Sequence, residues 1–136
     1  MLTLAIDTAT KVCTIALCRD KEILAEYTIN MQRTGVQKQD IELLAVSMGP
    51  GSFTGLRIGL ATAEAMAYSW QCCLHGVDTL KAMAYNIQLE GRVLSPVLDA
   101  QKGNFYQALY EWRNGELVEL APVEVVSAEK ALERIA

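Results

Sequence analysis

The sequence predicts an α/β protein, and two features of the chain lead to this fold class. The first is a strand, a tight loop and a helix in direct succession: residues 43–46 are apolar, residues 49–55 contain three glycines and a proline, and residues 55–68 have a helical pattern. This succession is a building unit of α/β folds. The second feature is a duplication, in which two groups of three strands each begin with a strand that ends in an aspartate, Asp7 or Asp99.

Each copy of the duplication is a meander, in which short turns join three strands. The predicted strands of the first copy are residues 2–6, 12–17 and 23–29, and those of the second copy are residues 93–98, 104–112 and 117–126. The predicted elements outside the meanders are a short strand over residues 74–77, a helix over residues 79–86 and a last helix over residues 128–136. We therefore expect two lobes, residues 1–91 and residues 92–136.

Composition excludes several classes of function. The chain has 136 residues, of which 51% are hydrophobic, so a core of ordinary size is expected. Its net charge is −4 and its pI is about 5.0, and it has no basic run, so any contact with RNA would depend on a basic partner. No apolar run is long enough to span a membrane, and the first residues lack the basic start of a secretory signal. We expect a cytoplasmic protein.

Metal-dependent and nucleophilic catalysis have little support in the residues. The chain has four cysteines without a Cys-x-x-Cys pair and a single histidine, His75, whereas zinc sites and metallopeptidases use several such ligands at short spacings. No spacing links Ser52 to His75 and an aspartate as a catalytic triad. We expect neither a metal ligand nor a catalytic residue in this chain.

The glycine-rich loop before the predicted helix has two interpretations. It is either a phosphate-binding loop, because the free amides at a helix N-terminus attract anions, or a tight turn without a ligand. A P-loop requires a lysine after its spacer, and no lysine lies between Gln39 and the end of the helix. Arg57 is the only cation nearby. The sequence therefore favours the tight turn.

The predicted helix carries a stripe of small residues, because Gly55, Gly59, Ala63 and Ala67 recur at every fourth position and share one face. Glycine inside a helix costs about 1 kcal/mol relative to alanine, so its presence at residue 59 indicates that another part of a protein approaches closely. That part belongs either to the protein's own sheet or to a helix of a partner. On the second interpretation, we expect Gly59→Leu to weaken partner binding while the fold is retained.

The connection that precedes the strand at residues 43–46 is unusually polar. Buried parallel strands need a crossover of about a dozen residues, which is usually helical. Residues 30–40 show no apolar helical face. Either this connection is a bare loop, or a segment is absent near Thr34 and Gly35.

Three motifs occur together in this chain: Ile-Asp-Thr-Ala-Thr at residues 6–10, the glycine-rich loop and helix start at residues 49–59, and Asp-Ala-Gln-Lys-Gly-Asn-Phe-Tyr at residues 99–106. This combination resembles the TsaB (YeaZ) family, a glycoprotease-like family with the actin-like ATPase (ribonuclease H-like) fold. The resemblance covers essentially the whole chain. Family members have a helix at the position of this polar connection. They also extend well past Ala136, so the resemblance implies that the second lobe is incomplete.

The resemblance implies a non-catalytic assembly subunit. TsaB-like proteins dimerise with the catalytic paralogue TsaD, and the ATPase TsaE joins them. The complex transfers a threonylcarbamoyl group to the adenosine next to the anticodon of tRNA. ATP and metal are then used by the partners, tRNA is reached only through the complex, and the protein forms a homodimer when alone. The alternative is a glycoprotease-like peptidase or a kinase-like ATPase that acts alone.

Two groups of candidate site residues follow. The candidate partner interface comprises Gly55, Leu56, Gly59, Leu60, Ala63 and Ala67. Asp7, Thr8, Asp99 and Lys102 are candidates for a weak or vestigial contact with ATP or ADP in the cleft that the resemblance implies. Turn capping is the alternative role for the two aspartates. Ala9 stands where ATPases of this fold have a glycine, and its methyl group hinders the approach of a phosphate.

Overall fold

The computed structural model describes residues 1–9, 14–26 and 37–135. They form two compact units, Met1–Val77 and Asp78–Ala136, and each is described by itself. The division falls after Val77, earlier than the predicted boundary at residues 91 and 92, because the helix that follows Val77 packs against later strands. The predicted gap near Thr34 and Gly35 lies outside the described residues.

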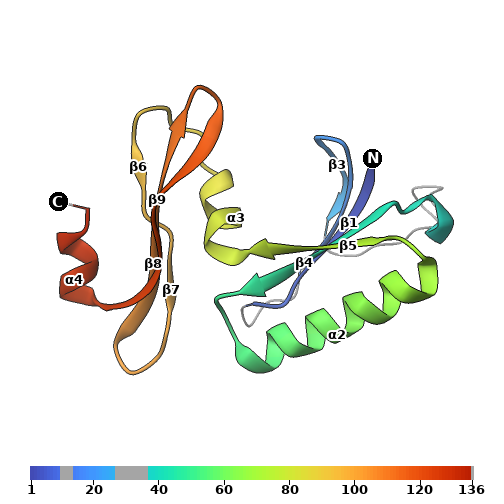
Figure 1. Cartoon of the computed structure of the whole chain (residues 1–136), viewed down its shortest axis with the longest axis horizontal. Helices are drawn as coiled ribbons and strands as arrows, with labels where there is room; N and C mark the ends of the chain where they lie inside the picture. The colour runs from blue at the N-terminus through green and yellow to red at the C-terminus, as the bar shows by residue number, and fades with distance from the viewer. Residues whose placement is uncertain (10–13, 27–36, 136) are drawn as a thin grey trace. The chain divides into compact units, whose positions relative to one another are not determined.

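The first unit is built on a five-stranded mixed sheet (Figure 1). Its strands are β1 (Leu2–Asp7), β2 (Thr14–Arg19), β3 (Glu22–Glu26), β4 (Leu43–Gly49) and β5 (Cys73–Asp78), in the order β3-β2-β1-β4-β5. β1 pairs antiparallel with β2 and parallel with β4, and a 3-10 turn, η1 (Lys38–Asp40), precedes β4. The predicted strands at residues 2–6 and 43–46 are thus neighbours at the centre of the sheet.

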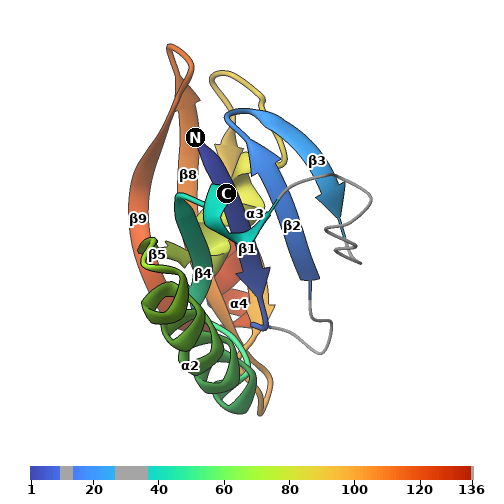
Figure 2. The same ribbon diagram turned by 90° about the vertical axis from the view of Figure 1, so that its right-hand side faces the viewer.

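A long helix, α2 (Phe53–Trp70), runs along this sheet, as Figures 1 and 2 show from two directions. Alternate residues of β1 are buried, as expected for a strand with one face toward a core. Ile6 of β1 and Val46 of β4 pack with Ala63 of α2, and Leu4 and Leu44 belong to a neighbouring cluster with Ala67. Full burial of each leucine is worth about 2 kcal/mol, so this contact fixes α2 on the sheet.

The second unit is a helix-covered sheet whose central strand is β8. Its elements are α3 (Thr79–Tyr85), β6 (Val93–Leu94), β7 (Val97–Asp99), β8 (Asn104–Arg113), β9 (Glu116–Ser127) and α4 (Ala128–Glu133). β6, β7 and β9 all pair antiparallel with β8. Leu80 and Ala84 of α3 form a buried cluster with Ala108 and Tyr110 of β8.

One predicted strand, residues 93–98, is two strands in the structure. Pro96 lacks the amide that a continuous ladder needs. β6 and β7 therefore pair with successive stretches of β8, with Leu94 opposite Tyr110 and Val97 opposite Gln107. The other strands of the second meander are confirmed, and α2 extends two residues beyond its predicted range at each end.

A buried amide side chain holds α4 against β8. Gln107 is 1% exposed, and its Nε2 donates to the Ser95 hydroxyl and to the Ala131 carbonyl oxygen, both at 2.9 Å. Arg134 Nη1 donates to Gln107 Oε1 at 3.3 Å, so both ends of the amide are bonded. Among the described residues, no helix combines the length and apolar character that crossing a membrane requires.

Candidate functional site

The helix α2 begins with a side-chain cap and continues without a break. The Ser52 hydroxyl accepts a hydrogen bond from the Gly55 amide at 3.3 Å, as the preference for serine at this position leads us to expect. The helix ends at Trp70, and the residue that caps it, Gln71, has a left-handed φ of 53°. The site described below is the surface of this helix, which has an inner face of small residues and an outer face of exposed residues that include several large apolar side chains.

The inner face is packed against the chain's own first loop. A Cβ atom at Gly51 would collide with the Ala9 carbonyl oxygen, and one at Gly55 would collide with the Thr8 carbonyl oxygen. A Cβ at Gly59 would collide with the Thr8 hydroxyl. The glycines therefore leave room for Thr8 and Ala9, which belong to the loop that follows β1.

This packing corrects the predicted partner interface. Gly59, Ala63 and Ala67 are buried against the protein's own strands and loop, and Gly55 is closed off by the backbone of Thr8. Of the two interpretations of the stripe, contact with the protein's own sheet and loop is the one found. Leu56 and Leu60, also predicted at the interface, are half-buried.

The loop after β1 is also bonded to the start of α2. The Ser52 amide donates to the Ala9 carbonyl oxygen at 2.6 Å, so the chain itself occupies one donor that a phosphate would use. Ala9 is 2% exposed, which places its methyl group inside this contact. The Thr8 hydroxyl is buried without a hydrogen-bond partner. The glycine-rich loop is thus a tight turn that receives another loop.

The two repeated aspartates cap turns in the same way. Asp7 Oδ1 accepts from the Ala9 amide and Asp99 Oδ1 accepts from the Gln101 amide, each at 2.8 Å and each two residues along the chain. This is the capping role named as the alternative to nucleotide contact. The equal geometry agrees with the duplication inferred from the sequence. Asp7 and Asp99 lie in different units.

Lys102 lies exposed in the turn after Asp99. Its φ is 53°, between a φ of 67° at Gln101 and 76° at Gly103, so three successive residues are left-handed. The contact of Lys102 with a nucleotide stays a prediction. Among the residues described, no group of three or more His, Cys, Asp or Glu side chains gathers as metal ligands would.

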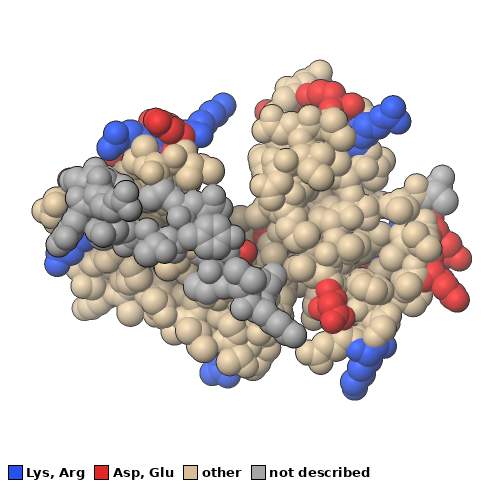
Figure 3. All heavy atoms as spheres, turned by 180° about the vertical axis from the view of Figure 1, so that it is seen from behind, with Lys and Arg blue, Asp and Glu red and all other residues tan. Residues whose placement is uncertain are grey.

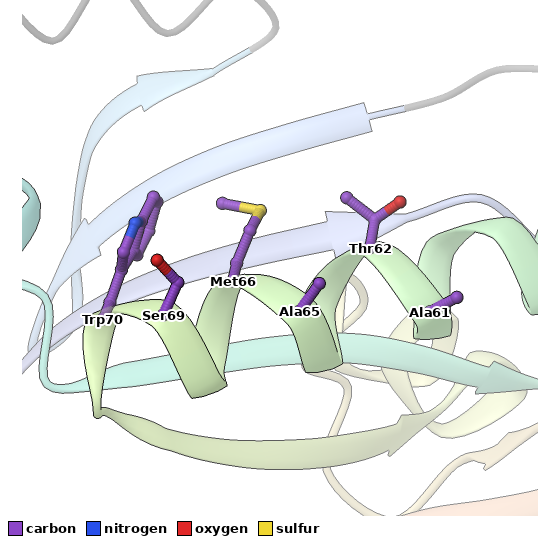
Figure 4. Close-up of a pocket in the computed structure, with 6 residues that line it drawn as sticks. All are labelled: Ala61, Thr62, Ala65, Met66, Ser69 and Trp70. Carbon is purple, nitrogen blue, oxygen red and sulfur yellow. The ribbon is translucent and has the colours of Figure 1, made fainter.

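The outer face of α2 carries a second stripe of small residues, which the sequence reasoning missed. Ala61, Ala65 and Ser69 recur at every fourth position and are exposed. Figure 4 shows them beside Met66 and Trp70 along a hollow that side chains of this helix line. The four-residue spacing of Ala61, Ala65 and Ser69 is present in the sequence, but the prediction considered only the stripe that contains the glycines.

Large apolar side chains accompany the outer stripe. Phe53 is 73% exposed, Ile58 61% and Tyr68 88%, all on this helix. Single exposed apolar residues are common on proteins, whereas a group on one element is typical of an interaction surface. We call the exposed residues of this helix the outer face of α2; they are Phe53, Thr54, Arg57, Ile58, Ala61, Thr62, Glu64, Ala65, Tyr68 and Ser69.

Comparison with known proteins assigns the chain to a family. A family model described as TsaD, tRNA N6-adenosine threonylcarbamoyltransferase, matches residues 21–135. The chain belongs to this family. The TsaD family model thus covers most of both units.

Two curated relatives are more specific than the TsaD family model. The tRNA threonylcarbamoyladenosine biosynthesis protein TsaB of Bacillus subtilis (strain 168) is 31% identical over 99% of this chain and 66% of its own length. TsaB of Escherichia coli (strain K12) is 34% identical over 93% of this chain and 64% of its own length. They confirm the resemblance to TsaB, and the chain spans just under two thirds of their length.

A solved structure confirms the fold. It is described as an uncharacterized protein with similarity to peptidase YEAZ from Pseudomonas aeruginosa, and it superposes with a TM-score of 0.79. The two are 24% identical, and the match covers 95% of this chain and 68% of that one. The likeness confirms the predicted α/β fold, and together with the TsaD family match it fits the predicted actin-like ATPase type.

Proposed function

We propose that this chain is a non-catalytic assembly subunit in the biosynthesis of threonylcarbamoyladenosine in tRNA. It dimerises with a TsaD-like catalytic paralogue, and the complex transfers the threonylcarbamoyl group to the adenosine next to the anticodon. The observation that carries the proposal is the exposed apolar outer face of α2, on a chain whose relatives are named as TsaB proteins of this biosynthesis.

The outer face has the composition of a helix-packing surface. Ala61, Ala65 and Ser69 allow the backbone of a second helix to come close, because their side chains are short. Phe53 and Tyr68 near the ends of α2 are aromatic, and aromatic residues are enriched at the cores of protein interfaces. This moves the proposed interface from the inner stripe to the opposite side of the same helix.

The structural role of the loop after β1 supports the part of the proposal that makes this chain non-catalytic. The carboxylate of Asp7 is engaged by the Ala9 amide, and the Ala9 carbonyl oxygen accepts from Ser52. A loop that binds phosphate instead directs its amides toward the ligand. The loop in this chain is used to fasten β1 to α2.

The remaining partners follow from the same proposal. The protein forms a homodimer through the outer face when the paralogue is absent, and a TsaE-like ATPase joins the heterodimer. ATP and metal act in those partners, with at most a weak nucleotide contact at exposed Lys102, because the Thr8 hydroxyl is buried against Gly59. On the described residues of the face that Figure 3 shows, lysine and arginine occupy separate places without a continuous basic band. This and the net charge of −4 support the proposal that tRNA is held through the complex.

The test is a charge placed at the centre of the outer face. Ala65→Arg introduces a bulky cation where a partner helix would pack, and we expect it to abolish co-purification with the catalytic paralogue of the same genome. Ala82→Arg, at an exposed position of α3, is the matched control and should co-purify normally. Undiminished co-purification of Ala65→Arg would contradict the proposed interface.

A second measurement addresses the alternative of an enzyme that acts alone. The chain should restore threonylcarbamoyladenosine in tRNA only when the paralogue is present. Calorimetry of the isolated chain with ATP and magnesium should show no tight binding and no turnover. Turnover by the isolated chain would favour a kinase-like ATPase and overturn the proposal.

A further inference from the structure

Arg57 is an isolated cation in an apolar hollow at the N-terminal end of α2. Phe53, Thr54, Arg57, Ile58 and Ala61 line this hollow. Arg57 is the only charged residue among them, and the flanking Phe53 and Ile58 are among the most exposed apolar side chains of the described chain. The hollow thus combines an apolar wall with one positive charge.

The guanidinium group of Arg57 is positioned by an aromatic ring and forms no ion pair with the residues that the structure describes. Its Cζ atom lies 5.4 Å from the centre of the Phe53 ring, within the range of a cation–π contact. Among the described residues, the salt bridges are formed by other groups, and no carboxylate lies within ion-pair distance of Arg57. Stacking on the ring restricts the side chain, so less conformational freedom is lost when the group binds a ligand.

We propose that Arg57 recognises a carboxylate of the protein partner that docks on the outer face of α2. This inference rests on the proposed function and adds the chemistry of the contact. A planar guanidinium binds a carboxylate through two parallel hydrogen bonds, which fixes orientation as well as position. The contact lies near the N-terminus of α2, where the helix dipole also favours a negative charge.

The surroundings of Arg57 favour a protein carboxylate over a nucleic-acid phosphate. Proteins that hold a phosphate backbone use several cations along a band, whereas the hollow has one, and the chain carries a net charge of −4. Exposed Phe53 and Ile58 match the apolar stem of a glutamate or aspartate on a helix surface. The occupant is therefore an acidic side chain of a helix that packs on α2.

The experiment measures the affinity of the purified TsaD-like paralogue for variants of this chain. Arg57→Glu should weaken binding by about a hundredfold and Arg57→Gln by about tenfold, because a buried charge pair loses its partner. Arg57→Lys should recover part of the affinity, since it keeps the charge without the planar group. Arg57→Glu is expected to fold, because residue 57 is exposed on the surface of the helix.

The controls separate this inference from the proposed function. Arg92→Glu makes the same change of charge in an exposed turn of the second unit and should leave the affinity unchanged. If Ala65→Arg abolishes binding while all Arg57 variants bind within twofold of the parent chain, the carboxylate contact is refuted and the interface stands. If the unaltered chain does not bind the paralogue, the proposed function fails first.

Dependence on salt and on tRNA gives a further check. Binding of the parent chain should weaken as ionic strength rises, and Arg57→Gln should lose most of that dependence. If Arg57→Glu instead reduces the binding of tRNA to the assembled complex and leaves the affinity for the paralogue unchanged, Arg57 binds a phosphate and the inference is overturned.

Discussion

At Gly55, the backbone of a neighbouring segment leaves no room for any residue larger than glycine. Its missing side chain leaves room for the Thr8 carbonyl oxygen, which belongs to the backbone of another segment and has little freedom to move. Gly59 faces the Thr8 side chain instead, which is more adaptable. The requirement for glycine in the inner stripe is therefore stricter at Gly55 than at Gly59.

Replacement of Gly55 by alanine should destabilise the first unit. Helix propensity alone predicts that this change stabilises the protein by up to about 1 kcal/mol. The collision with the Thr8 carbonyl oxygen should reverse the sign and lower the free energy of unfolding by about 2 kcal/mol. Urea unfolding would measure the difference, with Ala65→Gly on the exposed face as a propensity control. A Gly55→Ala protein as stable as the parent would mean that the loop does not rest there.

The same geometry changes what Gly59→Leu would report. We expected this substitution to weaken partner binding with the fold retained. Because Gly59 is buried against Thr8, a leucine there would disturb the contact between α2 and the first loop. Loss of binding in that variant would reflect damage to the fold, so Ala65→Arg is the informative substitution.

Among the elements, α4 depends on one polar side chain. This helix has six residues, none of which is buried, so it has little apolar contact of its own. Gln107 bonds its backbone at Ala131, and Arg134 bonds Gln107 in return. Ser127 caps the first turn through the Lys130 amide. The position of α4 therefore rests on hydrogen bonds and on the ion pairs of Lys130 and Arg134 with Glu124, at 3.9 and 3.7 Å.

Replacement of Gln107 by leucine should release α4. The change leaves the Ala131 carbonyl oxygen without its donor and removes one acceptor of Arg134, whose guanidinium keeps only the ion pair with Glu124 at 3.7 Å, and this should lower the free energy of unfolding by about 2 kcal/mol. Ser95→Ala removes one acceptor of the same amide and should cost less, about 1 kcal/mol. Thermal unfolding and the nuclear magnetic resonance signals of α4 would show both effects, and an unchanged α4 in Gln107→Leu would refute this role.

Local patterns predicted most of the elements, but they did not predict which face of α2 is free. The four-residue spacing of Gly55, Gly59 and Ala63 identifies one side of a helix and a close approach. It carries no information on whether the approaching atoms belong to the same chain. Long-range packing of the loop after β1 decides that question, because Thr8 lies far from Gly55 and Gly59 in the sequence and meets them only in the folded chain.

The same limit applies to the break at Pro96 and the boundary at Val77. Proline signals an interrupted ladder, yet only the pairing of β6 and β7 with one strand shows that both halves stay in the sheet. The unit boundary depends on the packing of α3 against β8, which no local feature near Gly91 reveals. The capping roles of Asp7 and Asp99 were foreseen because they are local.

At the scale of the whole molecule, the buried side chain of Tyr110 makes the free energy of unfolding depend on pH in the alkaline range. Burial of Tyr110 raises the pKa of its hydroxyl above the ordinary value, and the charges of Asp78 and Glu119 raise this pKa further. The unfolded chain ionises this group near pH 10, whereas the folded chain keeps it neutral. The stabilising effect is therefore complete below about pH 10 and is lost as the pH rises above that value.

The corresponding prediction is a fall in stability at alkaline pH that depends on Tyr110. The free energy of unfolding should decrease with pH above about 10 in the parent chain, and the decrease should be smaller in Tyr110→Phe. Denaturant unfolding at a series of pH values would measure both slopes. Tyr68, which is 88% exposed, provides the control, because Tyr68→Phe should leave the slope unchanged. Equal slopes in the parent and in Tyr110→Phe would contradict this account.

The pairing of β8 has a consequence for how quickly each sheet assembles. β8 meets β7 and β9 across short turns, whereas β1 must find β4 across a separation that places Thr3 beside Leu43. Closing a longer loop costs more chain entropy before any contact compensates for it. Refolding should therefore protect the amides of β8 from solvent deuterium before those of β4, and the opposite order in a pulse-labelling experiment would show that chain connectivity does not govern the folding route.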